Sequence, residues 1–374
     1  MKVPFLDLKA QYKEIKEKVN PAIQEVLDNC SFVLGKTVAG FESSFAEALG
    51  VKYCHGVSSG TDGNHLVLWA LGIGPGDEVI IPANTFIATA WGATLCGATP
   101  VFVDCHKESY NLDPAKVEAS ITPKTKAIVA VHLYGQPADI DPLRRIAEEH
   151  NLYFVEDCAQ AHFAEYKGKR VGGFGIASSF SFYPGKNLGA YGEAGAVVTS
   201  NEELSAKLKM MRDHGALQKY NHESFGHNYR MEGIQGAVLG VKLGYLEKWN
   251  ESRRKAAAKY KERLNGIPAI MLPKEMEYAK HVYHLFPIQL PDTEKRDMLA
   301  AYLNENEIAT GLHYPIPLHL QPCFNYLHYK KGDCPVTEKL AECELTLPVF
   351  PEISDEQIDF VSTKIKEFVV KNGL

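Results

Sequence analysis

Three short segments contain side chains that together could bind one phosphorylated aldehyde. Lys186 follows the strand-like run at residues 180–183 after a Pro184-Gly185 turn, Asp157 ends the apolar run at residues 152–156, and Ser58-Ser59-Gly60-Thr61 follows another run. A lysine amine can bind an aldehyde covalently, and a buried carboxylate can keep a ring nitrogen protonated. Small polar residues that open a helix can bind phosphate. Together these groups meet the requirements of pyridoxal 5′-phosphate (PLP), so the sequence predicts a PLP site.

Each segment also has an ordinary structural interpretation. Most lysines are exposed on helices, aspartate often caps a helix, and Ser-Ser-Gly-Thr is a common helix start. Phe86, after a further apolar run, fits a core aromatic as well as it fits a ring stacked on the cofactor. Gln160 lies three residues after Asp157, so on one turn it could face the same cavity and bond the phenolic oxygen of PLP. The combination of the segments, more than any one of them, favours the site.

The elements that must position these residues alternate between strands and helices. Apolar runs predict strands at residues 53–57, 78–82, 100–104, 127–133, 152–157, 177–183 and 194–199. These runs are mostly continuous rather than alternating, which is typical of a parallel sheet covered on both faces. Helices are expected between them, at residues 63–71, 85–97, 142–150 and 202–214. We therefore predict an α/β fold with a mostly parallel central sheet.

The pattern changes after about residue 200. Residues 235–264 predict one long helix, which Gly266 and Pro268 end. The other expected elements are a strand and two helices, at residues 282–290, 296–305 and 355–370. We predict a large PLP-binding domain at residues 1–250 and a small C-terminal α+β domain at residues 251–374.

Composition limits the classes of partner and site. The 374 residues carry a net charge of −6 with no basic stripe, so no nucleic-acid partner is expected. No apolar run reaches the roughly 18 residues of a membrane span, and the N-terminus lacks the apolar core of a signal peptide. We therefore expect a cytoplasmic protein. No Cys-x-x-Cys pair is present, and the spacing of His313 and His319 is not that of a zinc site, so no metal is expected.

Longer motifs, in order along nearly the whole chain, resemble the DegT/DnrJ/EryC1/StrS aminotransferases. These are PLP enzymes that install amino groups on nucleotide-linked sugars. The matching motifs include Val3-Pro4-Phe5-Leu6-Asp7-Leu8, Ser59-Gly60-Thr61-Asp62, Val131-His132-Leu133-Tyr134-Gly135-Gln136, Gly226-His227-Asn228-Tyr229-Arg230 and His313-Tyr314-Pro315. The resemblance implies the fold-type I architecture of PLP-dependent transferases and a homodimer with active sites at the interface.

The resemblance also implies a role for each matched residue. Lys186 would bind the PLP aldehyde and then move a substrate proton, while Asp157 would pair with the pyridine nitrogen. Gln160 would face the phenolic oxygen, and Phe86 would stack on the ring. The other implied contacts are Gly60, Thr61 and Ser181 with the phosphate, Asn228 with the phosphate in the neighbouring subunit, and His313, Tyr314 and His319 at the sugar-nucleotide side.

Lysine at position 186 favours transamination, because a dehydratase branch of the family has histidine there. The expected reaction moves an amino group from L-glutamate to a nucleotide-linked ketosugar, with a dTDP-3-keto-6-deoxyhexose preferred and a UDP-linked 3- or 4-ketosugar as the near alternative. A PLP-dependent sugar dehydratase and a non-catalytic sugar-nucleotide-binding relative stay open as less favoured alternatives. A hydrolase that uses Cys158 and His162 is a weaker one.

The sequence departs from the usual family pattern at three places near these motifs. After the lysine, Gly192-Glu193-Ala194-Gly195 replaces the common Gly-Asp-Gly-Gly. Gly63-Asn64 replaces the frequent Ala-Leu, and Phe163 follows His162 where glycine is usual. The Phe163 side chain is bulky and is expected close to the site, where it would change the shape of the sugar pocket. None of the departures removes a catalytic group.

Overall fold

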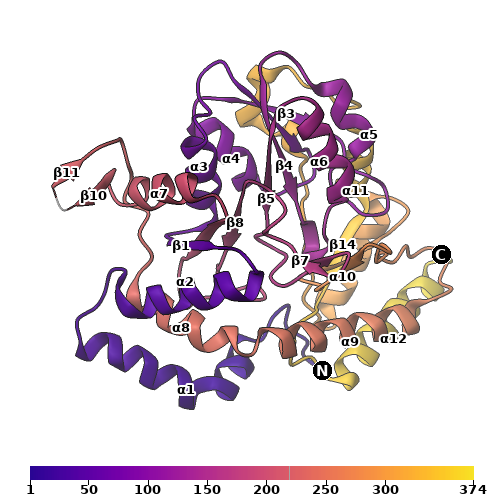
Figure 1. The fold of residues 1–374 in the computed structure, drawn as a ribbon. Coiled ribbons are helices and arrows are strands. Elements are labelled where there is room, and N and C mark those ends of the chain that lie inside the picture. The colour runs from indigo at the N-terminus through magenta and orange to yellow at the C-terminus, as the bar shows by residue number, and fades with distance from the viewer. Residues whose placement is uncertain (219) are drawn as a thin grey trace.

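A seven-stranded sheet forms the centre of the molecule (Figure 1). The computed structural model describes residues 1–218 and 220–374. In spatial order the strands are β1 (Tyr53–Val57), β9 (Gly195–Thr199), β8 (Ala177–Ser181), β5 (Tyr153–Asp157), β4 (Thr125–Val131), β2 (Glu78–Pro82) and β3 (Thr99–Val103). Only β9 runs antiparallel to its neighbours. The predicted α/β fold with a mostly parallel sheet is therefore confirmed.

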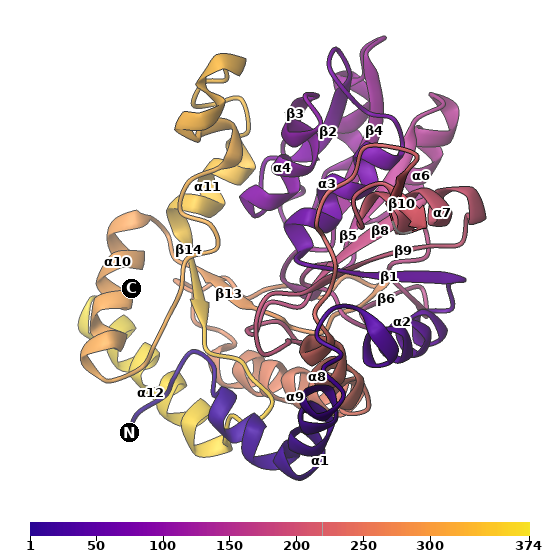
Figure 2. The same cartoon turned by 90° about the vertical axis from the view of Figure 1, so that its left-hand side faces the viewer.

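Helices cover both faces of this sheet (Figure 2). One face packs against α3 (Gly60–Ala70), α4 (Ile87–Leu95) and α7 (Glu202–Met211), and the other against α2 (Gly35–Leu49) and α6 (Ile140–Glu149). Successive residues of a strand point to opposite faces, so Val155 lies in the core beneath α3 and α4. Asp157 shares that face with Val155, whereas Glu156 points to the opposite one.

The long helix expected over residues 235–264 is instead two helices, so that prediction is wrong. The first, α8 (Gly233–Leu243), ends at Gly244, and α9 (Leu246–Leu264) begins after Tyr245. Glycine lowers helix stability by about 1 kcal/mol relative to alanine, which favours a break at this position. Two N-terminal helices, α1 (Leu8–Asp28) and α2, were not predicted, and both pack against α8.

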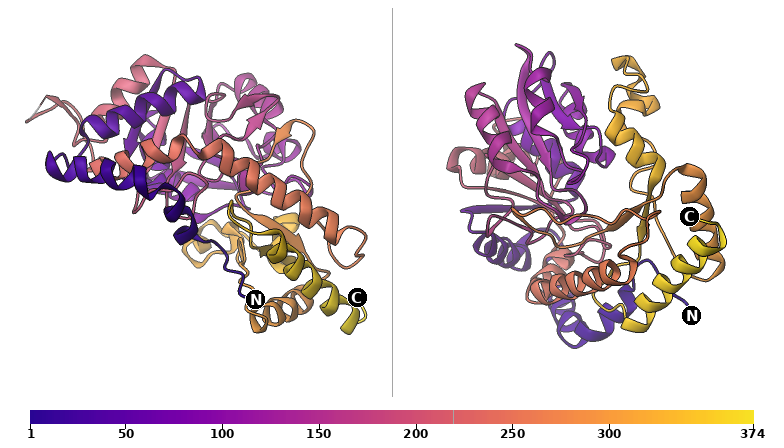
Figure 3. Two further views of the ribbon diagram at one scale, coloured as in Figure 1. Left: turned by 90° about the horizontal axis from the view of Figure 1, so that it is seen from below. Right: turned by 90° about the vertical axis from the view of Figure 1, so that its right-hand side faces the viewer.

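The C-terminal residues build a second core, which α9 reaches from the sheet (Figure 3). Here β13 (Phe286–Gln289) pairs with β14 (Glu344–Leu347), and α10 (Thr293–Glu305) and α12 (Asp355–Lys371) pack beside them. Val3 joins this core through a parallel bridge to Ile308. Because α9 contributes to both cores, the domain boundary at residue 250 stays a prediction.

The remaining elements are short. They are α5 (Pro114–Val117), α11 (Pro335–Cys343), β6 (Glu165–Tyr166), β7 (Lys169–Arg170), β10 (Ala216–Gln218), β11 (Asn221–His222), β12 (Ala279–Lys280), and the 3₁₀ turns η1 (Glu118–Ser120), η2 (Leu133–Gly135), η3 (Leu318–Leu320) and η4 (Pro322–Leu327). In the part of the chain that the structure describes, no helix is long and apolar enough to cross a membrane.

Candidate active site

A cavity of about 600 Å³ lies where the parallel strands end. The carboxyl ends of parallel strands meet at one edge of the sheet, which is where α/β proteins bind ligands. Segments that follow β1, β2, β5 and β8 contribute to the lining, together with C-terminal residues. The predicted site residues in this lining are Gly60, Thr61, Phe86, Asp157, Gln160, Ser181, Lys186, His313 and Tyr314.

Lys186 supplies the amine of the cavity. It follows β8 through a tight turn in which its backbone N–H donates to the Tyr183 carbonyl over 2.9 Å. Burial lowers the pKa of the Lys186 amine to about 8, while the Asp157 carboxylate acts in the opposite direction. Among the described residues, none forms a hydrogen bond or ion pair with this amine. A minor fraction of the amine is therefore uncharged at neutral pH and a large fraction at mildly basic pH, and the uncharged form can attack an aldehyde.

Asp157 is 3% exposed and is held in one orientation. Its Oδ2 accepts hydrogen bonds from Asn64 Nδ2 (2.9 Å) and Thr89 Oγ1 (2.8 Å), and its Oδ1 accepts one from the Ala159 backbone N–H (3.0 Å). Asn64 is fixed in turn by the Ser179 hydroxyl. A carboxylate oxygen can accept more than one hydrogen bond, so the group can still receive a ring N–H.

Asn64 and Thr89 were missed by sequence reasoning. Both side chains come from helices on the Asp157 face of the sheet and are buried. Asn64 is a polar residue two positions before the apolar run at residues 66–68 of α3. A polar side chain on the buried face of a helix needs a partner, and that pattern could have identified it.

The start of α3 forms a close-fitting anion cradle. Ser59 caps the helix by accepting from the Asp62 backbone N–H over 3.1 Å. Gly60 lies against Ser181 of the neighbouring segment, and a Cβ at Gly60 would lie 2.5 Å from the Ser181 Cβ. The first N–H groups of a helix have no partner within the helix and attract phosphate. The absence of a side chain at Gly60 allows the two segments to approach.

Gly60→Ala should weaken PLP retention, because the new Cβ would push these segments apart. Overpacking costs about 1–3 kcal/mol, which corresponds to an increase of about 5- to 150-fold in the dissociation constant. Titration of the protein with PLP would measure this change in the dissociation constant. Gly240→Ala is the control, since a Cβ there would meet nothing within 4 Å. Equal affinity in Gly60→Ala and the native protein would contradict the cradle.

Gln160 and two aromatic residues, Phe86 and Tyr314, also line the cavity. Gln160 Oε1 accepts from the Tyr134 backbone N–H (2.6 Å), and its Nε2 donates to the Tyr314 hydroxyl (2.9 Å). An amide carries two N–H donors, so one is left for a ligand. Phe86 is 51% exposed and its ring centroid lies 5.6 Å from that of Tyr314.

Two predicted site residues lie outside the cavity lining. His319 lies in η3, is 2% exposed, and its Nε2 lies 2.9 Å from Glu338 Oε1. This placement gives no support to the predicted substrate contact. Asn228 is exposed, and its Oδ1 accepts from Arg230 Nε over 3.0 Å. A contact between Asn228 and a neighbouring subunit stays a prediction.

The expectation that Phe163 shapes the sugar pocket is wrong. Its side chain is 6% exposed and stacks on Phe45, with ring centroids 6.4 Å apart. The Arg170 guanidinium lies 3.8 Å from the Phe163 ring centroid. The φ angle of +63° at this residue turns the side chain into the core under α2 and away from the cavity.

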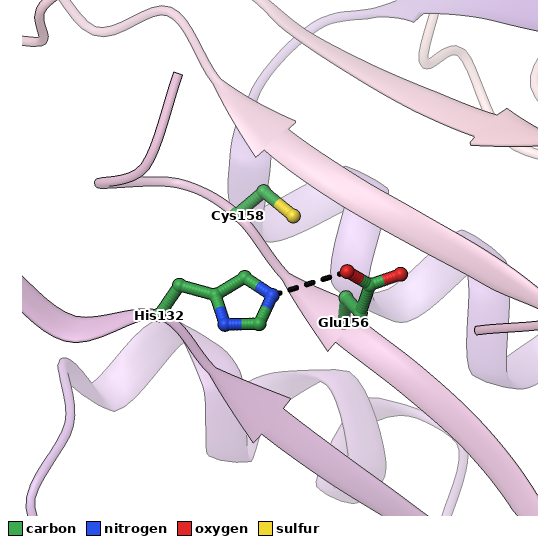
Figure 4. Close-up of side chains that lie close together, drawn as sticks. All are labelled: His132, Glu156 and Cys158. Atoms are coloured by element: carbon green, nitrogen blue, oxygen red, sulfur yellow. Dashed lines mark hydrogen bonds and ion pairs between the residues drawn. The ribbon is translucent and has the colours of Figure 1, made fainter. Parts of the chain in front are cut away.

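One cluster among the described residues has the composition of a metal site: His132, Glu156 and Cys158 (Figure 4). The carboxylate of Glu156 already accepts from three backbone N–H groups of the loop before β8 and from the Ser178 hydroxyl. His132 Nδ1 accepts from the Ala138 N–H, so its Nε2 carries the proton and donates to Glu156 over 3.1 Å.

Burial raises the pKa of the Cys158 thiol well above its ordinary value. The thiol therefore stays protonated and is not a nucleophile at neutral pH. The hydrogen bonds that His132 and Glu156 already make connect the loop before β8 to the sheet. We assign the cluster a structural role, which also removes the basis of the hydrolase alternative.

The residues around the cavity fit PLP. A buried amine, a fixed carboxylate and a helix start with a glycine at its closest approach surround one space. The amine can bind the aldehyde, the carboxylate can hold the ring nitrogen protonated, and the helix start can take the phosphate. Three independent groups thus match three separate parts of one cofactor.

Comparisons with known proteins agree with this chemistry. The family model for DegT/DnrJ/EryC1/StrS aminotransferases matches residues 13–366. A dTDP-3-amino-3,4,6-trideoxy-α-D-glucose transaminase of Streptomyces venezuelae is 45% identical over 98% of this chain and 96% of its own. A UDP-N-acetyl-3-dehydro-α-D-glucosamine 3-aminotransferase of Acidithiobacillus ferrooxidans is 44% identical over 97% of both chains.

A solved structure is similar over the same length. DesV of S. venezuelae, in complex with a ketimine intermediate, has a TM-score of 0.95 at 44% identity and covers 98% of both chains. A second solved structure, NtdA of Bacillus subtilis with the bound cofactor PMP, has a TM-score of 0.92 at 34% identity, over 98% of this chain and 85% of its own. The sequence similarity and the fold therefore lead to the same class of PLP protein.

Proposed function

Because the chain belongs to the DegT/DnrJ/EryC1/StrS aminotransferase family of PLP-dependent nucleotide-sugar aminotransferases, we propose that it moves the amino group of L-glutamate to a dTDP-linked 3-keto-6-deoxyhexose. The observation that carries this proposal is the unpaired, low-pKa amine of Lys186 in the same cavity as the fixed Asp157 carboxylate. Lysine rather than histidine at position 186 favours amino transfer over dehydration.

The choice of sugar rests on relatives and has a rival. Two dTDP-sugar transaminases, at 45% and 42% identity, favour the dTDP-linked substrate. The relative that acts on a UDP-linked 3-keto sugar is almost as similar, at 44%. A UDP-linked 3-ketosugar is therefore the second candidate.

Bound PLP would supply an electron sink for the carbon that loses its proton. In our proposal the residues of this chain perform the remaining tasks. Lys186 would remove the proton from the amino donor and return it to a carbon of the cofactor, since its amine can be neutral near pH 8. Asp157 keeps the ring nitrogen protonated, which maintains the electron demand. The α3 cradle and Phe86 hold the phosphate and the ring in place.

A spectroscopic experiment tests this function. The visible spectrum of the PLP-loaded protein is recorded before and after addition of L-glutamate, and the converted protein is then mixed with dTDP- and UDP-linked ketosugars. Conversion by glutamate followed by recovery with a dTDP-linked 3-ketosugar is expected. Recovery with only a UDP-linked sugar would select the second candidate. A spectrum that glutamate leaves unchanged would contradict L-glutamate as the donor.

We also propose that two copies share their active sites. Phe86 and Tyr183 line the cavity although they are 51% and 54% exposed in the single chain. Such exposed aromatic rings beside a cavity are typical of an interface. In this arrangement Asn228, which lies outside its own cavity, reaches the phosphate bound by the other copy.

A mixed dimer tests the shared site. Asn228→Ala and Lys186→Ala proteins should each be weak or inactive alone, but a dimer with one chain of each should regain activity. In that dimer one site combines the native Lys186 of one chain with the native Asn228 of the other. Activity of the mixture is measured after the chains have been exchanged. If a verified mixed dimer regains no activity, Asn228 either acts in the site of its own chain or takes no part in a site.

A further inference from the structure

His313 is fixed in the cavity by two buried side chains of β14. Its backbone N–H donates to Glu344 Oε2 over 2.8 Å, and its ring Nδ1 lies 2.8 Å from Thr346 Oγ1. The Thr346 hydroxyl in turn contacts Glu344 Oε1. Glu344 and Thr346 are two residues apart on a strand and so share one face. The result is a continuous chain of hydrogen bonds from the cavity lining to a buried carboxyl group.

The chain of hydrogen bonds determines the tautomer of His313. The Thr346 hydroxyl has one proton, which it donates to Glu344 Oε1. In the ionised form of Glu344, which is populated at neutral pH and predominates at mildly basic pH, that carboxylate is an acceptor only. It must then accept the Nδ1 proton of His313. The other ring nitrogen, Nε2, is left as an acceptor, and no described residue bonds to it. Because His313 lines the cavity, Nε2 is the atom available to a ligand.

The surroundings favour a neutral His313. Burial, with a contribution from the charge of Lys186, lowers the pKa of His313 to about 4. Burial raises the pKa of Glu344 to about 7, against the hydrogen bonds from His313 and Thr346 and the charge of Arg296 on α10. The other titratable groups that face Glu344 are the hydroxyls of Tyr110, Tyr134 and Tyr314. A proton that enters at His313 is therefore better held on Glu344 than on the ring.

We propose that Glu344 and Thr346 are positioning residues that make His313 one end of a neutral proton relay. As His313 Nε2 takes a proton from the reacting amine, its Nδ1 proton passes to Thr346 Oγ1, and the Thr346 proton passes to Glu344. The steps then reverse, and His313 Nε2 gives the proton to the carbonyl oxygen. The C–N bond forms, the C–O bond breaks, and the two amine protons leave with the oxygen as water. His313, Thr346 and Glu344 end in the protonation states in which they began, so the net charge of the protein is unchanged.

The relay rests on the proposed amino transfer, but its first test needs no ketosugar. Nitrogen-15 NMR of histidine in the PLP-loaded protein reports which nitrogen of His313 carries the proton, with assignment by comparison with His313→Gln. We expect protonated Nδ1 in the native protein and in Thr346→Ser. Thr346→Val, of matched shape, should lose this preference, with thermal unfolding confirming that the variant is folded. Protonated Nε2 in the native protein, or an unchanged tautomer in Thr346→Val, would overturn the relay.

The glutamate half-reaction gives the kinetic readout, because release of its keto acid runs the same water step in reverse. Thr346→Val should slow this single turnover by about 10²-fold, near the lower range for general acid–base groups, and Thr346→Ser should restore most of the rate. Glu344→Gln should remove the inflection near pH 7 from the pH profile. A Thr346→Val protein with the native rate and pH profile would overturn the relay. If the native protein reacts with glutamate but with none of the ketosugars, the proposed acceptor is wrong. The relay is then still decided by the NMR and the glutamate half-reaction.

Discussion

Lys186→Ala should abolish amino transfer and the visible absorbance of covalently bound PLP. The variant removes the only lysine amine in the cavity lining of the described residues. It removes both the covalent attachment and the group that moves the proton, and a general acid–base group alone contributes about 10²- to 10⁴-fold. We therefore expect a loss of at least about 10⁴-fold in turnover. The absorbance change during a single turnover with L-glutamate measures this loss.

The chain offers a matched control at Lys242. Burial lowers the pKa of that amine to about 8 as well, but its Nζ donates to the Gly189 carbonyl over 2.7 Å and lies outside the cavity. Reduction with borohydride and peptide mapping should find PLP on Lys186 in the native protein and in Lys242→Met. Because the Lys186 pKa is about 8, capture of PLP by the cofactor-free protein should also become faster as the pH rises through that value. PLP on another lysine would contradict the assignment.

The residues that we propose to act on the cofactor were easier to predict than the residues that support them. Asp157 ends an apolar strand, and Gly60 and Lys186 follow two others within a few residues, so local sequence places them at the ligand-binding edge of a parallel sheet. The contact between Asn64 and Asp157 joins residues 93 positions apart, and only the packed fold defines it. The relay from His313 to Thr346 likewise depends on strand pairing between Gly311 and β14. Local patterns carry no information about such partners.

The two misplaced side chains have backbone causes. His319 was grouped with His313 because the two are close in sequence, but His319 lies in η3, where its buried ring contacts Glu338 of α11. Phe163 occupies a position where the family usually has glycine, and its φ of +63° explains that preference. A non-glycine residue in this conformation costs roughly 1–2 kcal/mol. Packing against Phe45 and Arg170 offsets that cost and keeps the ring out of the site.

Asp157→Asn should fold with reduced stability and lose about 10²- to 10⁴-fold in the single-turnover rate with L-glutamate. An amide of the same shape carries no charge, so it cannot hold the ring nitrogen in its protonated form. Its NH₂ group must also face either the Ala159 N–H or the donors of Asn64 and Thr89. One donor then loses its acceptor, which costs about 1–3 kcal/mol. Stopped-flow absorbance and thermal unfolding separate the two effects.

Asn64→Leu distinguishes charge from packing at this site. It removes one hydrogen bond to Asp157 but leaves the carboxylate and its bonds from Thr89 and Ala159. We expect a loss of stability similar to that of Asp157→Asn, because Asp157 and Ser179 each lose a partner, with a rate much closer to the native one. Asp157→Asn would then differ from Asn64→Leu in rate but not in unfolding temperature. If the two variants lost rate equally, orientation by the surrounding hydrogen bonds, rather than the negative charge of Asp157, would be the source of its effect.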